Sequence, residues 1–148
     1  MTTIVRIADL EPDALQALRA ESSQEGLKFM DRLYDEWASG ANLFDGSGEA
    51  FFLAVADGRV VGVCGLNRDP YAQDARTGRV RRLFVLRNYR GKGIGRALLD
   101  AVIAHAREHF DLLRVRTDAA DDFYAKHGFR RDRSSAEATH ILGFASTA

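Results

Sequence analysis

The sequence predicts an α+β (mixed α/β) fold in which helices cover both faces of a mixed sheet. Three observations predict it: a hairpin signal at 51–63, a long amphipathic segment at 94–110, and apolar runs that alternate with helical patterns. With 148 residues, of which 46% are hydrophobic, the chain is long enough to bury one full core. Residues 1–148 contain no repeat and no linker, so we expect a single domain.

The first half of the chain predicts a strand, two helices and a hairpin. Residues 4–7 alternate apolar and polar side chains, which indicates a short first strand. A helix is expected over 12–21, because its first residue is proline. Apolar residues at three- and four-residue spacing predict a second helix over 27–37. The runs 51–56 and 59–63 are joined by Asp-Gly, which favours the tight turn of a β-hairpin.

The second half predicts a polar loop over 67–78, followed by strands and helices in alternation. We expect strands at 79–86, 112–116, 129–131 and 138–142, and helices at 94–110 and 119–127. Gly128 suits the left-handed position that ends a helix.

The charge balance and the single cysteine argue against several classes of function. The 21 basic and 21 acidic residues cancel, so a dedicated nucleic-acid binder is not favoured. Cys64 stands alone, which leaves no internal disulfide or cysteine-rich zinc site, and its apolar run predicts burial. No stretch reaches membrane-spanning length, and the first residues lack the apolar core of a signal peptide. We expect a soluble, cytoplasmic protein with no membrane or nucleic-acid partner.

A glycine-rich segment at 90–96 is the most informative stretch for function. Three glycines and three cations fall within its seven residues, between an apolar run and an amphipathic segment. Glycine lets the backbone approach a ligand closely, and the first N–H groups of a helix have no intrahelical partner. The helix dipole and the cations add positive potential. The segment therefore predicts a site for a phosphate-bearing ligand.

Spacing rules out two common phosphate sites. A Walker-type loop needs four residues between its first glycine and Gly-Lys-Ser/Thr, and no Ser or Thr follows Lys92. A dinucleotide fingerprint needs G-x-G-x-x-G, whereas Gly91, Gly93 and Gly95 form G-x-G-x-G. A nucleotide-dependent phosphotransferase is therefore not favoured.

Three segments instead resemble the GNAT superfamily of acetyltransferases. Residues 90–95 match its Arg/Gln-x-x-Gly-x-Gly/Ala motif, 82–85 resembles the strand before that motif, and 120–129 resembles its second signature. The resemblance is strong from Phe51 to Phe129. It implies a central mixed sheet of about six to seven strands flanked by about four helices.

The resemblance implies an N-acetyltransferase that moves an acetyl group from acetyl-CoA to a primary amine of a small molecule, peptide or protein, by direct attack in a ternary complex. No metal is expected, since none of the four histidines has metal-ligand spacing. An unpaired strand edge suits the two amides of the pantetheine arm. The implied CoA-binding residues come from that strand, from the glycine-rich turn and from a position where relatives often carry Asn: Leu83, Phe84, Val85, Arg90, Gly91, Lys92, Gly93, Ile94, Gly95, Arg96 and Thr117.

Tyr124 is the catalytic candidate. It matches the tyrosine that protonates the departing thiolate in many of these enzymes, and a phenol supplies a proton without carrying charge at neutral pH. The alternative is that Tyr124 packs beside Phe123 as a structural aromatic. A cysteine nucleophile is not favoured, because Cys64 reads as a core residue.

The general base is left open. Many relatives carry a Glu where this chain has Arg79, and a cation cannot accept a proton. Asp118 is expected to cap the next helix. A non-catalytic acyl-CoA sensor or interaction module is therefore a second interpretation, and both a monomer and a homodimer fit the sequence. Four carboxylates lie in segments that would flank the acceptor, and each is more readily a surface charge: Glu21, Glu25, Glu36 and Glu49.

Overall fold

Seven strands form one sheet in a computed structural model that describes residues 2–144. The strands are β1 (Thr2–Ile7), β2 (Ala50–Ala56), β3 (Arg59–Arg68), β4 (Thr77–Val85), β5 (Leu112–Val115), β6 (Arg130–Arg131) and β7 (His140–Gly143). The helices are α1 (Gln16–Gln24), α2 (Phe29–Ser39), α3 (Ile94–Arg107) and α4 (Asp121–Lys126), with 3₁₀ turns η1 (Pro12–Leu15) and η2 (Arg87–Tyr89). The strand order is β1-β2-β3-β4-β5-β7-β6, and β4 pairs with β5 in parallel while the other neighbours are antiparallel.

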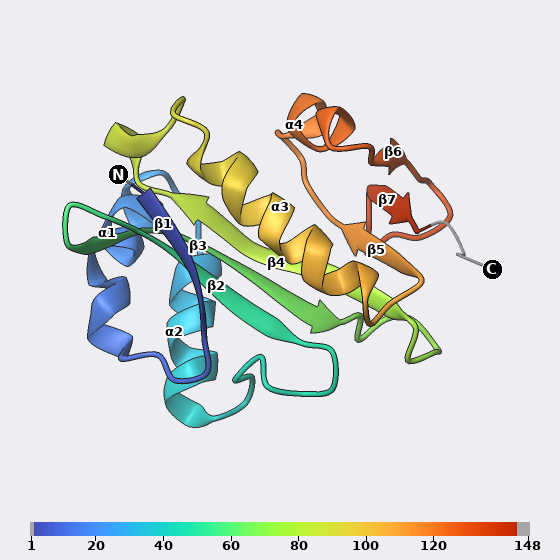
Figure 1. Cartoon of the computed structure of the whole chain (residues 1–148), viewed down its shortest axis with the longest axis horizontal. Coiled ribbons are helices and arrows are strands. Elements are labelled where there is room, and N and C mark those ends of the chain that lie inside the picture. Colours follow the sequence, from blue (N-terminus) through green and yellow to red (C-terminus); the bar gives the residue numbers. More distant parts are fainter. Residues whose placement is uncertain (1, 145–148) are drawn as a thin grey trace.

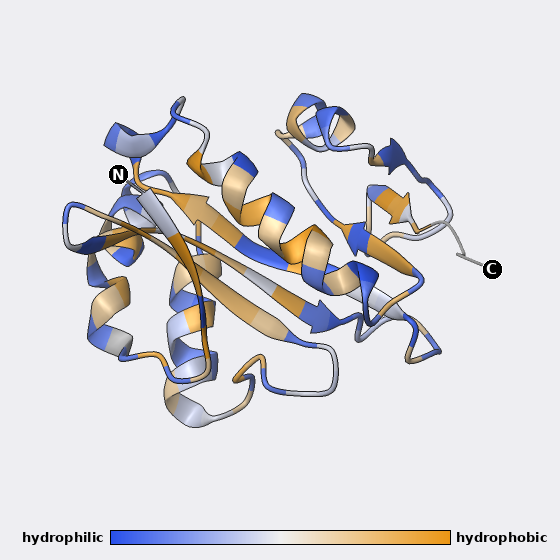
Figure 2. Ribbon diagram, viewed as in Figure 1, coloured by the Kyte–Doolittle hydropathy of each residue, from blue (hydrophilic) through white to orange (hydrophobic). Residues whose placement is uncertain are grey.

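Helices cover both faces of the sheet, as predicted. α3 lies across one face, while α1 and α2 lie behind the sheet (Figure 1). The inner side of α3 buries Leu98 and Val102, and Trp37 of α2 packs edge-on against Phe51 of β2. Hydrophobic residues run along the central strands between these layers (Figure 2). The mixed sheet and its four helices confirm the predicted fold class.

The strands β3 and β4 reach further into the loop between them than predicted. β3 and β4 both extend, so the polar loop expected over 67–78 shrinks to 69–76. Asn67 stays in β3 because its side-chain amide bonds Asn42 and Glu49. The first predicted helix begins as the turn η1, and α1 extends beyond its predicted end. The predicted hairpin turn is confirmed, since Asp57 and Gly58 both take positive φ.

A β-bulge in β4 opens the sheet at its centre. The register of β3 against β4 shifts between Val63 and Gly65, and Arg82 takes a φ of 63°, which non-glycine residues rarely adopt. Nη2 of Arg82 donates to Glu36 at 2.8 Å, which ties the bulge to α2. Pairing between β4 and β5 ends at Arg79. Beyond that residue the two strands separate and leave one edge of β4 unpaired.

A side chain at Gly65 is expected to destabilise the core. A Cβ built there would lie 2.4 Å from Cε1 of Phe44, whose ring packs against Trp37 and Phe51. We expect Gly65→Ala to lower the free energy of unfolding by about 1–3 kcal/mol, as overpacking does, measured by urea denaturation. Gly143→Ala is the control, because no described atom lies within 4 Å of its Cβ. Equal losses for both variants would contradict this packing.

Candidate functional site

Two cavities meet where β4 and β5 separate. The first, which we call the turn cavity, has a volume of about 620 Å³ and is lined mainly by 83–85, 90–91 and 93–96. The second, the arginine cavity, has a volume of about 520 Å³ and is lined mainly by 79–83, 115–118, Arg32 and Tyr124. Three residues line both cavities, so the two spaces adjoin: Phe29, Leu83 and Ala120.

The glycine-rich turn leaves room for a ligand at the amino end of α3. Gly91 and Gly93 have φ values of 74° and 83°, and a Cβ at either position would meet no described atom within 4 Å. Gly93 is the N-cap of α3, and no side chain caps this end. The first N–H groups of the helix therefore face open space with the positive end of the dipole, which is the chemistry that binds phosphate.

The rest of the turn cavity is mostly apolar. Phe29, Phe84 and Ile94 line it together with the open edge of β4. Such a strip can take an extended chain with amides, because the strand edge offers donors and acceptors and the rings offer apolar surface. The residues present therefore fit the pantetheine arm and pyrophosphate of acetyl-CoA.

Arg90 spans the mouth of the glycine-rich turn. Its Nε donates to the carbonyl of Val85 at 2.8 Å, and its Nη2 donates to Glu25 at 3.0 Å. The hydrogen bond from Arg90 lowers the pKa of the Glu25 carboxyl, with a smaller contribution from Arg87. The guanidinium thus holds the end of β4 against α1, and the backbone N–H groups of the turn stay available for an anion.

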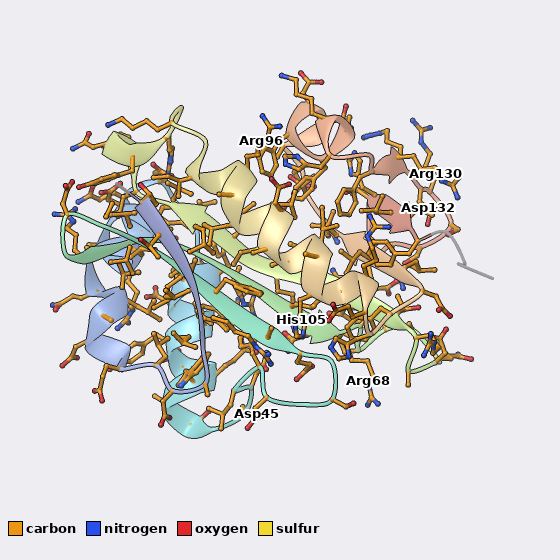
Figure 3. The ribbon with its side chains drawn as sticks, in the orientation of Figure 1. Asp45, Arg68, Arg96, His105, Arg130 and Asp132 are labelled. Atoms are coloured by element: carbon orange, nitrogen blue, oxygen red, sulfur yellow. The ribbon has the colours of Figure 1, made fainter. Side chains whose placement is uncertain are left out.

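Three other predicted donor-binding residues differ in where they lie. Arg96 lines the turn cavity on the first turn of α3 (Figure 3). Thr117 lines the arginine cavity instead. Lys92 lines neither, and its Nζ lies 5.5 Å from the centroid of the Tyr89 ring.

Tyr124 projects from α4 into the gap between β4 and β5. Its side chain is 5% exposed, packs edge-on against Phe123 and Phe129, and lines the arginine cavity. Burial raises the pKa of the phenol, so it is protonated at neutral pH. Its hydroxyl makes no hydrogen bond with another described residue, which leaves the proton available to a ligand in the cavity.

The segment before α4 corrects one prediction. Asp118 does not cap the helix, because α4 begins at Asp121 and its N-cap, Ala120, has no side-chain cap. The hydroxyl of Thr117 instead accepts a hydrogen bond from the backbone N–H of Ala120 at 3.0 Å. Asp118 is exposed and lines the arginine cavity. The carboxylate is therefore free to face a ligand.

The four glutamates considered as bases all lie outside the arginine cavity. Glu21 accepts the backbone N–H of Arg87, while Glu25 and Glu36 are ion-paired with Arg90 and Arg82. The fourth, in the loop before β2, accepts hydrogen bonds from the end of β3: Glu49. Each of these carboxylates is held by a neighbour in the described structure.

Arg79 has a structural partner. Its Nη1 lies 3.4 Å from Oδ2 of Asp69, and its Nη2 donates to the carbonyl of Glu137. Asp69 is 1% exposed and also lies 3.5 Å from Nη1 of Arg114. This buried network joins β4 and β5 to the loops beside them.

Among residues 2–144, no group of three metal-ligating side chains is close enough to hold a metal ion. In the same described part of the chain, no helix has the length and apolarity needed to cross a bilayer. Cys64 is buried, as predicted, and desolvation raises the pKa of its thiol, so it is poorly suited to act as a nucleophile.

Comparisons with known proteins agree with this geometry. A putative acetyltransferase from Exiguobacterium sp. 255-15 is 34% identical, with a TM-score of 0.86 over 97% of this chain and 93% of that one. A GNAT family N-acetyltransferase (YhbS) from Escherichia coli, solved in complex with CoA, is 20% identical, with a TM-score of 0.71 over 97% of this chain and 82% of that one. Glucosamine-6-phosphate N-acetyltransferase from Arabidopsis thaliana shares 14% identity, with a TM-score of 0.63 over 93% of this chain and 97% of that one.

A search of curated protein sequences finds no significant match. The family model described as the acetyltransferase (GNAT) family matches residues 11–129, which cover the glycine-rich turn and Tyr124. This chain therefore belongs to the GNAT family of acetyltransferases.

Proposed function

We propose that this protein is an N-acetyltransferase that moves an acetyl group from acetyl-CoA to a primary amine of a small molecule, a peptide or a protein, by direct attack in a ternary complex. The observation that carries the proposal is the junction at Leu83, where the turn cavity meets the cavity that holds the phenol of Tyr124. In this proposal residues 1–148 work as one catalytic domain in the cytoplasm, as a monomer or a homodimer.

In this proposal the donor lies along β4 and the glycine-rich turn. Backbone N–H groups of 90–96 and the side chain of Arg96 would bind its phosphates. The open edge at 83–85 would bind the amides of its arm. The thioester would then lie near Leu83, which lines both cavities.

Proton transfers are assigned to groups that line the arginine cavity. A neutral acceptor amine forms the new C–N bond as the C–S bond breaks, and Tyr124 donates its hydroxyl proton to the leaving thiolate. The surplus proton on the acceptor nitrogen leaves to water or to Asp118, which is exposed and lines this cavity. Tyr124 then regains a proton from solvent, since burial keeps the neutral phenol favoured.

Thiol release from acetyl-CoA tests the proposal directly. The protein is incubated with acetyl-CoA and a panel of amines, which includes amino acids, peptides and small polyamines, and free thiol is followed. Amine-dependent release with matching acetylated product supports an acetyltransferase. Binding of CoA without turnover on any amine would instead support the acyl-CoA sensor.

A further inference from the structure

The arginine cavity carries a strong excess of positive charge. Asp118 is the carboxylate among its described lining residues. Five guanidinium groups line the same space: Arg32, Arg79, Arg81, Arg82 and Arg116. A cavity with this lining favours an anion, because the positive potential of several cations adds within a confined space.

Two of these arginines already pair with a carboxylate. Arg79 pairs with buried Asp69, and Arg82 pairs with Glu36 at 2.8 Å. Both ion pairs hold β4 against neighbouring elements, which explains why these two guanidinium groups are present. They leave the remaining three guanidinium groups to be explained.

Arg32, Arg81 and Arg116 form no ion pair with a carboxylate of residues 2–144. Arg81 is half-buried on β4, and burial together with the nearby charge of Arg82 lowers its pKa. Arg116 is exposed, and its guanidinium donates to the carbonyl of Ala136 at 3.1 Å rather than to a carboxylate. Arg81 is thus a half-buried cation with no carboxylate at ion-pair distance, and an anionic ligand would offset the cost of its desolvation.

The phosphates of the donor do not explain these arginines. The turn cavity has its own cation, Arg96, and its own helix N-terminus, while the guanidinium of Arg90 there is paired with Glu25. The apolar side chains of Phe29 and Leu83 lie at the junction of the two cavities. The unpaired arginines therefore face the side of the junction where the acceptor would enter.

We infer that the acceptor is an amine that also carries an oxyanion, either a carboxylate or a phosphate, bound by Arg81 with Arg32 and Arg116. Guanidinium groups match both anions, because their planar N–H fork donates two parallel hydrogen bonds to adjacent oxygens. Asp118 lines the same cavity, so its carboxylate would lie near the amine end of such a molecule. The inference rests on the proposed function and narrows its acceptor to anionic amines.

Matched pairs of amines test the inference. At saturating acetyl-CoA, kcat/KM is measured by thiol release for L-alanine against L-alaninamide, and for O-phosphoethanolamine against ethanolamine. We expect the charged member of at least one pair to be preferred by about tenfold or more, as a charge-assisted contact provides. The pair that shows the preference identifies the anion as carboxylate or phosphate.

Variants that remove one positive charge show which arginines produce the preference for charged amines. Arg81→Gln and Arg32→Gln should each reduce the ratio of kcat/KM for the charged amine to kcat/KM for its neutral partner by about fivefold or more. Arg32 is an exposed residue of α2, so its variant tests the inference even if Arg81→Gln folds poorly. The control is Arg130→Gln, since Arg130 lies on β6 at the edge of the sheet and lines neither cavity (Figure 3).

Three outcomes would overturn the inference. The first is that the kcat/KM of each neutral amine equals or exceeds that of its charged partner. The second is that Arg81→Gln and Arg32→Gln lower kcat/KM equally for both members of a pair. If no probe is acetylated, binding of the same four amines to the CoA-bound protein is measured by calorimetry. The third outcome is that the charged and neutral members of each pair then bind equally or not at all. Failure of the proposed function differs, because it shows as CoA binding without thiol release from any amine.

Discussion

Replacing Tyr124 with Phe is expected to lower kcat at saturating acetyl-CoA by about 10²- to 10⁴-fold, the contribution typical of a general acid. The affinity for CoA should stay within about threefold, because the phenol acts on the transition state rather than on donor binding. The ring of Phe preserves the packing against Phe123 and Phe129, so the fold is retained. Thiol-release kinetics and a calorimetric CoA titration measure the two quantities.

Tyr89→Phe is the matched control for the hydroxyl. The Tyr89 hydroxyl donates to Asp57 at 2.8 Å and lines neither cavity, so its loss should leave kcat unchanged. If Tyr124→Phe also turns over at the wild-type rate, the phenol is a packing residue and another group must protonate the thiolate.

Removing the carboxylate of Asp69 is expected to have the largest effect on stability. We predict that Asp69→Ala lowers the free energy of unfolding by about 3–5 kcal/mol, the cost of leaving buried charge without its partner. Asp69 is 1% exposed and faces Arg79 at 3.4 Å and Arg114 at 3.5 Å. Its Oδ1 also accepts the backbone N–H of Tyr71 at 2.8 Å, so the loop loses its anchor as well. Urea denaturation measures the change.

Two further variants separate the effect of the charge of Asp69 from the effect of its buried position. Asp69→Asn keeps an acceptor for the N–H of Tyr71 and loses the charge, so it should recover only part of the stability. Asp111→Ala breaks the exposed pair with Arg76 and should cost a small fraction of the Asp69→Ala loss. Similar losses in the free energy of unfolding for Asp69→Ala and Asp111→Ala would show that the buried network stabilises the fold no more than the exposed pair does.

Local sequence signals predicted the regular parts of the fold. Asp57 and Gly58 specify a hairpin turn through their own backbone preferences, and Gly128, with a φ of 90°, follows α4 as predicted. The bulge in β4 carries no such signal. Arg82 holds a left-handed conformation through its contact with Glu36, which lies 46 residues away in the chain. A local sequence pattern cannot predict a conformation that residues distant in the chain determine.

The sequence indicates the lining of the turn cavity better than that of the arginine cavity. The proposed donor-binding residues are mostly contiguous in 83–85 and 90–96, so one motif covers most of them. The arginine cavity brings together Arg32 of α2, Arg81 of β4 and Arg116 after β5, which meet only in the folded chain. The structural role of Arg79 likewise depends on Asp69. The sequence of the polar loop gives no indication that Asp69 is buried.

A calorimetric titration of the protein with acetyl-CoA, CoA and ATP tests the central claim most directly, that the glycine-rich turn binds an acyl-CoA donor. We predict saturable binding of acetyl-CoA and CoA, and weaker binding in Gly93→Ala by about tenfold or more, because a side chain strains the left-handed backbone of the turn. Tight binding of ATP with no binding of CoA would contradict the account.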